Sequence, residues 1–282
     1  MRHEFGSFDG PRGATIVTQS WSPEGTPRAL LLLVHGLAEH CGRYMNLVER
    51  AVPRGFVVHS LDHVGHGRSD GARTYVRSFS NFTDTLEAYR AMLRHEHPEM
   101  PFFLVGHSLG ALIAAATLLD HQDAFRGAIL SGALVQVPDN ISPLTVFLSR
   151  LISRIVPRLR LVGVDASGVS RDPTVVRAYL EDPLVYNGKT TARLGFEILR
   201  TIRRVCAEAA TIRLPILFLH GEADRLTSVD GACKLHQAIL SADKTLRVYD
   251  GLHHEVYNEP EHPQVIEDVL AWIDVRVPTA AG

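Results

Sequence analysis

Six short apolar segments constrain the fold of this chain more than any other feature. They lie at residues 29–36, 55–62, 102–108, 127–134, 215–221 and 245–251, and turn residues bound each of them. Apolar residues run together in them rather than alternate with polar ones, as a sheet covered on both faces requires. Helical patterns separate them, and in residues 80–98 the apolar positions recur at helical spacing: Phe82, Leu86, Tyr89 and Leu93. The pattern predicts a mainly parallel α/β sheet flanked by helices.

One long segment interrupts this alternation of strands and helices. Residues 135–213 follow one predicted strand and precede the next, and they are rich in Arg, Pro and aliphatic residues. Connections inside a compact domain are usually much shorter than this. We therefore expect an inserted, mostly helical cap at 135–213, placed on a core formed by residues 1–134 and 214–282.

The first part of this cap, residues 142–163, has the pattern of a basic amphipathic helix. Its expected apolar face contains Leu144, Phe147, Leu148, Leu151, Ile152 and Ile155. Arginines occupy other positions, and Pro157 interrupts the pattern. Four roles are compatible with such a face: packing on the main domain, lining a lipid pocket, touching a membrane and forming a homodimer contact. The sequence leaves these choices, and the oligomeric state, open.

Charge and cysteine content argue against several other classes of protein. The 29 Lys and Arg residues nearly balance the 31 Asp and Glu residues, so nothing indicates a nucleic-acid partner. The three cysteines lie far apart, which does not fit a zinc site, a redox pair or a disulfide framework. The first residues lack the apolar core of a secretory signal, and no apolar run approaches the ~18 residues that span a bilayer. We expect a cytoplasmic protein that touches membranes only peripherally, through the cap.

The most informative chemical motif is Gly106-His107-Ser108-Leu109-Gly110. Gly-x-Ser-x-Gly often arises by chance, but here an apolar strand precedes it and a small-residue helix follows it. This strand-turn-helix context predicts that Ser108 is a nucleophile, with glycines that let the backbones approach closely. A serine hydroxyl is a weak nucleophile at neutral pH, so it needs a hydrogen-bonded base, usually a histidine held by a carboxylate.

The acid and the base are expected downstream of this serine. Asp224 lies in a turn just after a predicted strand. Glu222 is too close to the strand end, and Asp230 opens the next helix, where helix capping is its ordinary role, so we favour Asp224. The loop after the last strand offers His253 and His254 side by side as the base. Spacing alone does not choose between them.

An oxyanion hole needs two backbone amide donors. One comes from the residue after the nucleophile, which is Leu109, and the other from a loop after an early strand. The strand at 29–36 ends in His35-Gly36, where the chain turns sharply, so Leu37 is the expected second donor.

The other histidines are expected to have structural roles. His59, Asp62, His63 and His66 are close in sequence, but their spacing misses the H-x-H-x-D-H pattern of binuclear zinc hydrolases. We expect no metal and no organic cofactor. A buried, hydrogen-bonded role is also expected for His35 and His107, which flank the two predicted oxyanion donors.

Five blocks of the sequence, in this order and spacing, resemble the monoacylglycerol lipase family of serine α/β-hydrolases: VHGLAEHCGRY, LDHVGHGRSDGAR, VGHSLGA, HGEADRLTS and YDGLHHEVYNEPE. The likeness covers nearly the whole chain and is weak only in the cap. It implies an α/β-hydrolase fold with an eight-stranded core and a lid inserted after the sixth strand. It also implies that the substrate is a lipid ester, monoacylglycerol, which is hydrolysed to fatty acid and glycerol.

The resemblance also implies roles for single residues. Aligning the last block selects His254 as the base and leaves His253 to packing. In the family, a glutamate and an arginine of the first block lie near the glycerol end of the pocket, so Glu39 and Arg43 are candidates for alcohol-side binding. The chain departs from the family at the elbow, where a leucine replaces the common methionine and preserves the backbone donor. Thr227 stands where some animal members carry a cysteine, so we expect no thiol-reactive inhibition there.

Other interpretations share parts of this pattern. The same three catalytic residues are compatible with hydrolysis of lysophospholipids or short esters, and with acyl transfer to another alcohol. A serine at the elbow argues against haloalkane dehalogenase and epoxide hydrolase chemistry, which places an aspartate there. A non-catalytic lipid-binding protein of this fold usually lacks one of the three residues, whereas this chain has a candidate for each.

Overall fold

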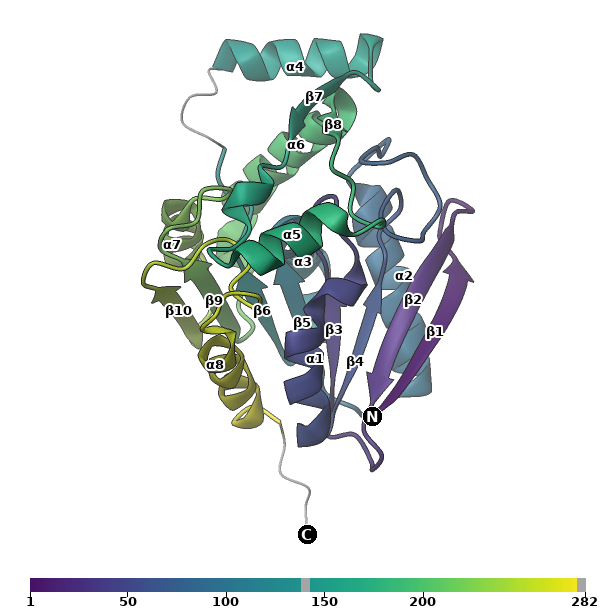
Figure 1. The fold of residues 1–282 in the computed structure, drawn as a ribbon, viewed down its shortest axis with the longest axis vertical. Coiled ribbons are helices and arrows are strands. Elements are labelled where there is room, and N and C mark those ends of the chain that lie inside the picture. The colour runs from purple at the N-terminus through teal and green to yellow at the C-terminus, as the bar shows by residue number, and fades with distance from the viewer. Residues whose placement is uncertain (138–142, 278–282) are drawn as a thin grey trace.

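Eight strands form one sheet at the centre of the molecule (Figure 1), in the order β1-β2-β4-β3-β5-β6-β9-β10. The computed structural model describes residues 1–137 and 143–277, with only the backbone of 143–148. The strands are β1 Arg2–Asp9, β2 Thr15–Ser22, β3 Ala29–Val34, β4 Phe56–Leu61, β5 Phe102–His107, β6 Gly127–Ser131, β9 Ile216–Gly221 and β10 Lys244–Tyr249. Neighbours from β4 to β10 are parallel, as the six apolar segments predicted.

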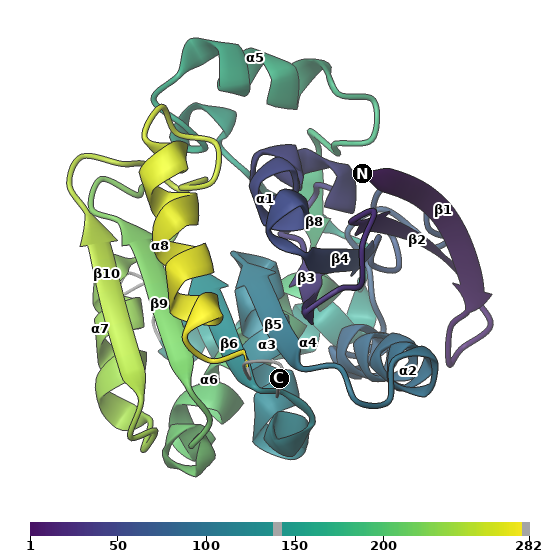
Figure 2. The same ribbon diagram turned by 90° about the horizontal axis from the view of Figure 1, so that it is seen from below.

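Helices cover both faces of this sheet. They are α1 Met45–Ala51, α2 Ser80–Glu96, α3 Leu109–His121, α6 Ala192–Glu208, α7 Val229–Ala238 and α8 His262–Asp274. Figure 2 shows α1 and α8 on one side of the sheet and α2 and α3 on the other. Because strand side chains alternate, Leu30 and Leu32 pack with the α2–α3 layer, whereas Leu31 and Leu33 pack with the α1–α8 layer. Fully burying each such leucine contributes about 1.5–3 kcal/mol, which explains why β3 is apolar at every position.

The N-terminal hairpin was not predicted from the sequence pattern. Strands β1 and β2 pair antiparallel, and β2 then pairs antiparallel with β4 at the edge of the sheet. Nearly every residue of β1 is exposed, so its sequence, RHEFGSFD, carries no apolar pattern. Backbone pairing with β2 holds this edge strand in place.

The segment between β6 and β9 contains α4 Pro143–Ile155, β7 Arg160–Gly163, α5 Pro173–Glu181, β8 Lys189–Thr191 and α6. Strands β7 and β8 form a small antiparallel sheet that the sequence pattern did not predict. Helix α6 packs against α3, and its apolar residues join the core on that side of the main sheet. Figure 1 shows α4, β7 and α5 beyond the ends of the parallel strands.

Helix α4 ends two residues before Pro157 and packs against α6. On its expected apolar face, Leu151 and Ile155 are exposed and Ile152 is half-buried. The side chains of Leu144, Phe147 and Leu148 lie outside the described residues. Part of this apolar face is therefore turned away from the protein core. Within the described ranges, none of the helices combines the length and apolar character needed to cross a membrane.

Candidate active site

Ser108 lies at the tip of a tight turn between β5 and α3. Its backbone adopts the positive φ of 55° with ψ of −118°, which is unusual for a residue other than glycine. Two glycines permit this turn, because a Cβ atom on Gly106 would lie 2.6 Å from the Gly110 carbonyl oxygen, and one on Gly110 would overlap the carbonyl of Val34. The turn has the strained strand-turn-helix geometry of a nucleophile elbow.

His254 and Asp224 lie next to each other in loops that follow two neighbouring strands, β10 and β9. His254 Nδ1 is 2.7 Å from Asp224 Oδ2, and both side chains are buried. The other oxygen of Asp224 accepts hydrogen bonds from the backbone amides of Leu226 and Thr227. A carboxylate at this position holds the ring proton on Nδ1 and leaves Nε2 free to accept a proton.

Two further side chains, neither of which was predicted to contact the acid, lie against the same oxygen of Asp224. His220 Nε2 lies 3.2 Å from Oδ2, and the hydroxyl of Thr227 donates a hydrogen bond to it at 2.8 Å. The sequence feature that could have indicated His220 is its polar side chain near the end of the otherwise apolar strand β9. Asp224 is thus held by side chains on both sides.

These contacts shift the acid–base properties of the pair. Burial lowers the pKa of His254, but the hydrogen bond and negative charge of Asp224, with Glu255 and Glu39, raise that pKa above its ordinary value. Burial raises the pKa of Asp224, but hydrogen bonds from His220 and His254 lower it far below its ordinary range. Asp224 is therefore ionised at neutral pH, and its charge favours the imidazolium form of His254.

Ser108 and His254 line the same cavity, which has a volume of about 320 Å³. Its wall also includes Gly36, Leu37 and Glu39, together with residues from the segment between β6 and β9. Gly36 packs directly on the serine, because a Cβ atom added to this glycine would lie 3.2 Å from Ser108 Cβ. The structure thus brings the predicted nucleophile, the predicted base and the predicted oxyanion loop to one cavity.

The two predicted oxyanion donors have amides that are available for a ligand. Leu109 is the first residue of α3, where an amide has no acceptor inside its own helix. Leu37 follows β3, and none of the described residues accepts a hydrogen bond from its amide.

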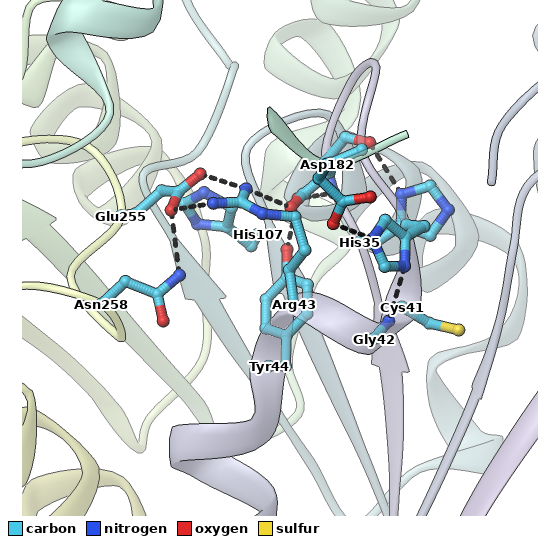
Figure 3. Close-up of polar contacts among 12 residues, drawn as sticks. His35, Cys41, Gly42, Arg43, Tyr44, His107, Asp182, Glu255 and Asn258 are labelled. Atoms are coloured by element: carbon cyan, nitrogen blue, oxygen red, sulfur yellow. Dashed lines mark hydrogen bonds and ion pairs between the residues drawn. The ribbon is translucent and has the colours of Figure 1, made fainter. Parts of the chain in front are cut away.

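Glu39 and Arg43 form an ion pair beside this cavity. Arg43 Nη1 lies 3.0 Å from Glu39 Oε2. The guanidinium also makes a two-point contact with Glu255, the residue that follows His254 (Figure 3). Both Glu39 and Glu255 line the cavity, and Arg43 is buried behind them. Sequence reasoning did not identify Glu255, although it is adjacent to the predicted base.

The two histidines that flank the predicted oxyanion donors, His35 and His107, are buried and bonded to the protein. His35 Nδ1 faces the Gly36 carbonyl oxygen at 2.8 Å, and its Nε2 accepts a hydrogen bond from the amide of His63. Burial lowers the pKa of His35 to about 4, so the ring is neutral at pH 7. His107 Nδ1 faces the hydroxyl of Ser131 at 3.0 Å. His253 does not contact Asp224 in any described hydrogen bond; its amide donates to Glu259.

The fold and this arrangement of loops define the chain as an α/β-hydrolase. A mostly parallel eight-stranded sheet is flanked by helices, and the strand-turn-helix at Ser108 lies at its carboxyl edge. The crystal structure of the Paleococcus ferrophilus monoacylglycerol lipase superposes with a TM-score of 0.82 and 29% identity, over 98% of this chain and 100% of that chain. A soluble variant of the Saccharomyces cerevisiae monoglyceride lipase has the same fold, with a TM-score of 0.85 and 21% identity over 98% of this chain and 96% of that one.

Sequence comparison narrows this class to a family. A family model described as serine aminopeptidase, S33 matches residues 25–261. A monoacylglycerol lipase from Mycolicibacterium smegmatis is 38% identical over 95% of both chains, and the human monoglyceride lipase is 34% identical over 95% of this chain and 89% of its own length. The chain belongs to the serine aminopeptidase S33 family and, within it, to the monoacylglycerol lipase family that the five sequence blocks resemble.

Proposed function

We propose that this protein hydrolyses monoacylglycerols to fatty acid and glycerol, with Ser108 as nucleophile, His254 as base and Asp224 as the acid that orients it. The 2.7 Å contact between His254 Nδ1 and Asp224, at the wall of the cavity that contains Ser108, is the observation that carries the proposal. Relatives named monoacylglycerol lipase support the substrate class. The proposal requires no metal or organic cofactor.

In the proposed mechanism, His254 Nε2 takes the hydroxyl proton while Ser108 Oγ attacks the ester carbonyl. The amides of Leu37 and Leu109 bind the tetrahedral oxyanion, and Asp224 stabilises the imidazolium. His254 then protonates the leaving glycerol oxygen and leaves the acyl group on Ser108. A water molecule that loses its proton to His254 attacks this acyl-enzyme and releases the fatty acid.

A second cavity, of about 350 Å³, supports an acyl-chain substrate. It shares Leu37, Leu134 and Val162 with the cavity that contains Ser108. Apart from a few small polar residues, aliphatic and aromatic side chains of β7 and α6 line it, including Phe196 and Leu199. An acyl chain in this cavity would place its ester carbonyl at the serine, with most of its surface away from water.

We place the alcohol end of the substrate on the polar side of the first cavity, near Glu39, Arg43 and Glu255. Glu39 and Glu255 line this side of the cavity, and carboxylate oxygens accept hydrogen bonds from hydroxyl groups. Residues 135–213 form the proposed cap, which supplies the apolar cavity from α6 and β7 and rests on a core of residues 1–134 and 214–282.

We also propose that the cap contacts membranes reversibly and that the protein works in the cytoplasm. Ile155, Val156 and Val162 are exposed by 70%, 48% and 71%, and exposed arginines lie between them at 158 and 160. Exposed apolar side chains beside cations bind the interface of an anionic membrane. Val162 also lines both cavities, so the membrane-facing surface adjoins the proposed substrate site.

The deciding experiment measures fatty acid release by the purified protein from a long-chain monoacylglycerol. A lysophospholipid, a triacylglycerol and p-nitrophenyl butyrate are tested in parallel, with Ser108→Ala as the blank. We expect the highest kcat/KM for the monoacylglycerol and a loss of about 10⁶-fold in kcat in the blank. Activity on p-nitrophenyl butyrate alone would support the assignment of the catalytic residues and contradict the proposal that the substrate is a monoacylglycerol.

A further inference from the structure

A buried ion cluster joins two loops of the proposed active site (Figure 3). Arg43 lies at its centre, with Nη1 3.0 Å from Glu39 Oε2 and 2.5 Å from Glu255 Oε1, and Nη2 2.9 Å from Glu255 Oε2. The side chains of Arg43, Glu39 and Glu255 are exposed by only 9%, 4% and 6%. Two carboxylates share one guanidinium here, so each of the two depends on Arg43 for its charge partner.

The Glu39 side of the cluster reaches the oxyanion loop. Glu39 Oε1 accepts hydrogen bonds from the Gly36 amide and from the Tyr44 hydroxyl, both at 2.6 Å. Gly36 directly precedes Leu37, whose amide is a proposed oxyanion donor. The direction of that amide therefore depends on the peptide that Glu39 holds.

The Glu255 side of the cluster reaches the histidine loop. Glu255 directly follows His254, its amide donates a hydrogen bond to the Val169 carbonyl at 2.8 Å, and Asn258 donates to its carboxylate at 2.9 Å. Arg43 is the group that spans both loops, across more than 200 residues of sequence. The ring of Tyr179, on α5, covers the guanidinium at 4.7 Å and excludes water from it.

We propose that Arg43 is a positioning residue that fixes the oxyanion loop relative to the histidine loop through Glu39 and Glu255. The identity of those loops rests on the function proposed above. Both terminal nitrogens of the Arg43 guanidinium already contact carboxylates of the protein. We therefore assign Arg43 mainly to holding these two loops, and only secondarily to contact with the substrate alcohol. A shift of about 1 Å between catalytic groups costs on the order of 10²-fold in rate, so a loosened cluster slows the reaction without weakening substrate binding.

The test compares Arg43→Met, Arg43→Lys and Glu255→Gln with the native protein on monooleoylglycerol and on p-nitrophenyl butyrate, which carries no glycerol. We expect kcat to fall by about 10- to 100-fold on both esters in Arg43→Met, with little change in KM. Arg43→Lys should recover only part of the rate, because an ammonium does not make the two-point contact with Glu255. Arg276→Met is the matched control. Arg276 also pairs with a carboxylate, that of Asp243, but this pair lies at the amino end of β10, at the opposite end of the strand from the active-site loops.

Glu255→Gln cuts the same contact with a neutral residue of equal shape, so it tests the proposal if Arg43→Met does not fold. In the double variant that combines Arg43→Met with Glu255→Gln, adding the second substitution should lower kcat much less than that substitution does in the native protein. The reason is that each of the two substitutions already breaks the same cluster. His254 is faced by Asp224 and His107, and by the carboxylates of the cluster. Loss of one carboxylate should therefore move the acid limb of the pH–rate profile of Glu255→Gln to lower pH, which a loss of stability would not do.

Two results would overturn the proposal. One is a loss of rate confined to monooleoylglycerol, which would make Arg43 a binding residue for glycerol. The other is independent, multiplying losses in the double variant. If the native protein hydrolyses the butyrate ester but not monooleoylglycerol, the proposed lipid function fails while the test of Arg43 on the short ester still stands.

Discussion

His220 Nε2 lies 3.2 Å from Asp224 Oδ2, the same oxygen that lies 2.7 Å from His254 Nδ1. Both His220 and Asp224 are fully buried, so no water replaces this contact. A carboxylate between two histidine rings has its orientation fixed from both sides. His220 also precedes Gly221, where β9 ends and the Asp224 loop begins.

Removal of this contact should slow catalysis. We expect His220→Leu to lower kcat on p-nitrophenyl butyrate by about 10-fold or more, because a hydrogen bond to a charged group contributes about 1.5–3 kcal/mol. His220→Gln keeps an N–H donor and should retain most of the rate. Equal losses in the two variants would show that the ring matters only for packing.

The length of the acyl chain that the protein accepts should depend on Gly195. This residue of α6 lines the 350 Å³ cavity, and a Cβ atom added there meets no other atom within 4 Å. Gly195→Leu should therefore fill the cavity and lower kcat/KM for monooleoylglycerol by about 10-fold or more, because each displaced methylene forfeits about 0.8 kcal/mol. The butyrate ester should be hydrolysed at the native rate.

Gly195→Ala provides the control for this change. It should leave the chain-length preference intact and raise the free energy of unfolding by up to about 1 kcal/mol, because alanine favours a helix over glycine. Parallel losses on the long and the short ester in Gly195→Leu would mean that the cavity does not hold the acyl chain.

Activity should depend on pH through His254. The base must be neutral to accept the serine proton, and the interactions with Asp224 outweigh burial and raise its pKa above the ordinary 6.5. The rate of butyrate hydrolysis should then fall as the pH drops through a midpoint above that value. Labelling of Ser108 by a fluorophosphonate should follow the same curve. A midpoint well below 6.5 in both measurements would contradict the assigned pair.

Membrane contact should depend on the exposed cap residues. We expect the double substitution of Ile155 and Val162 with Asp to weaken sedimentation with anionic liposomes by about 10-fold or more, since each buried aliphatic side chain contributes about 1.5–3 kcal/mol. Val275→Asp is the matched control, because Val275 is 78% exposed near the C-terminal end of α8, away from the cap. Unchanged liposome binding in the double variant would exclude this surface as the contact.

The sequence predicted the elements whose burial leaves a pattern. Each of the six apolar segments overlaps a strand of the parallel part of the sheet, and Phe82, Leu86, Tyr89 and Leu93 of α2 are buried, as their spacing indicated. β1 was not predicted because nearly all of its residues are exposed, and it is held by pairing with β2 together with the packing of Phe8 on Tyr89. Between His253 and His254 the sequence spacing gave no preference, and only the latter contacts Asp224 in the described structure.

Contacts between residues that are far apart in the chain leave no pattern in the sequence around either residue, so they could not be predicted. Arg43 and Glu255 are separated by more than 200 residues, and nothing in either neighbourhood indicates that a guanidinium closes on that carboxylate. The same holds for His220, whose place at the end of an apolar strand is equally consistent with a simple strand terminus. Side-chain geometry of this kind follows from the packing of the whole sheet.

The sharp turn at Ser108 also determines where the N-terminus of α3 lies. That helix starts at Leu109 and is buried along most of its length, so water screens its dipole only weakly. The aligned peptides place a partial positive charge of about half a unit next to the position where negative charge would develop on the substrate. This field exists before any substrate arrives, so the protein does not have to rearrange its own dipoles during the reaction.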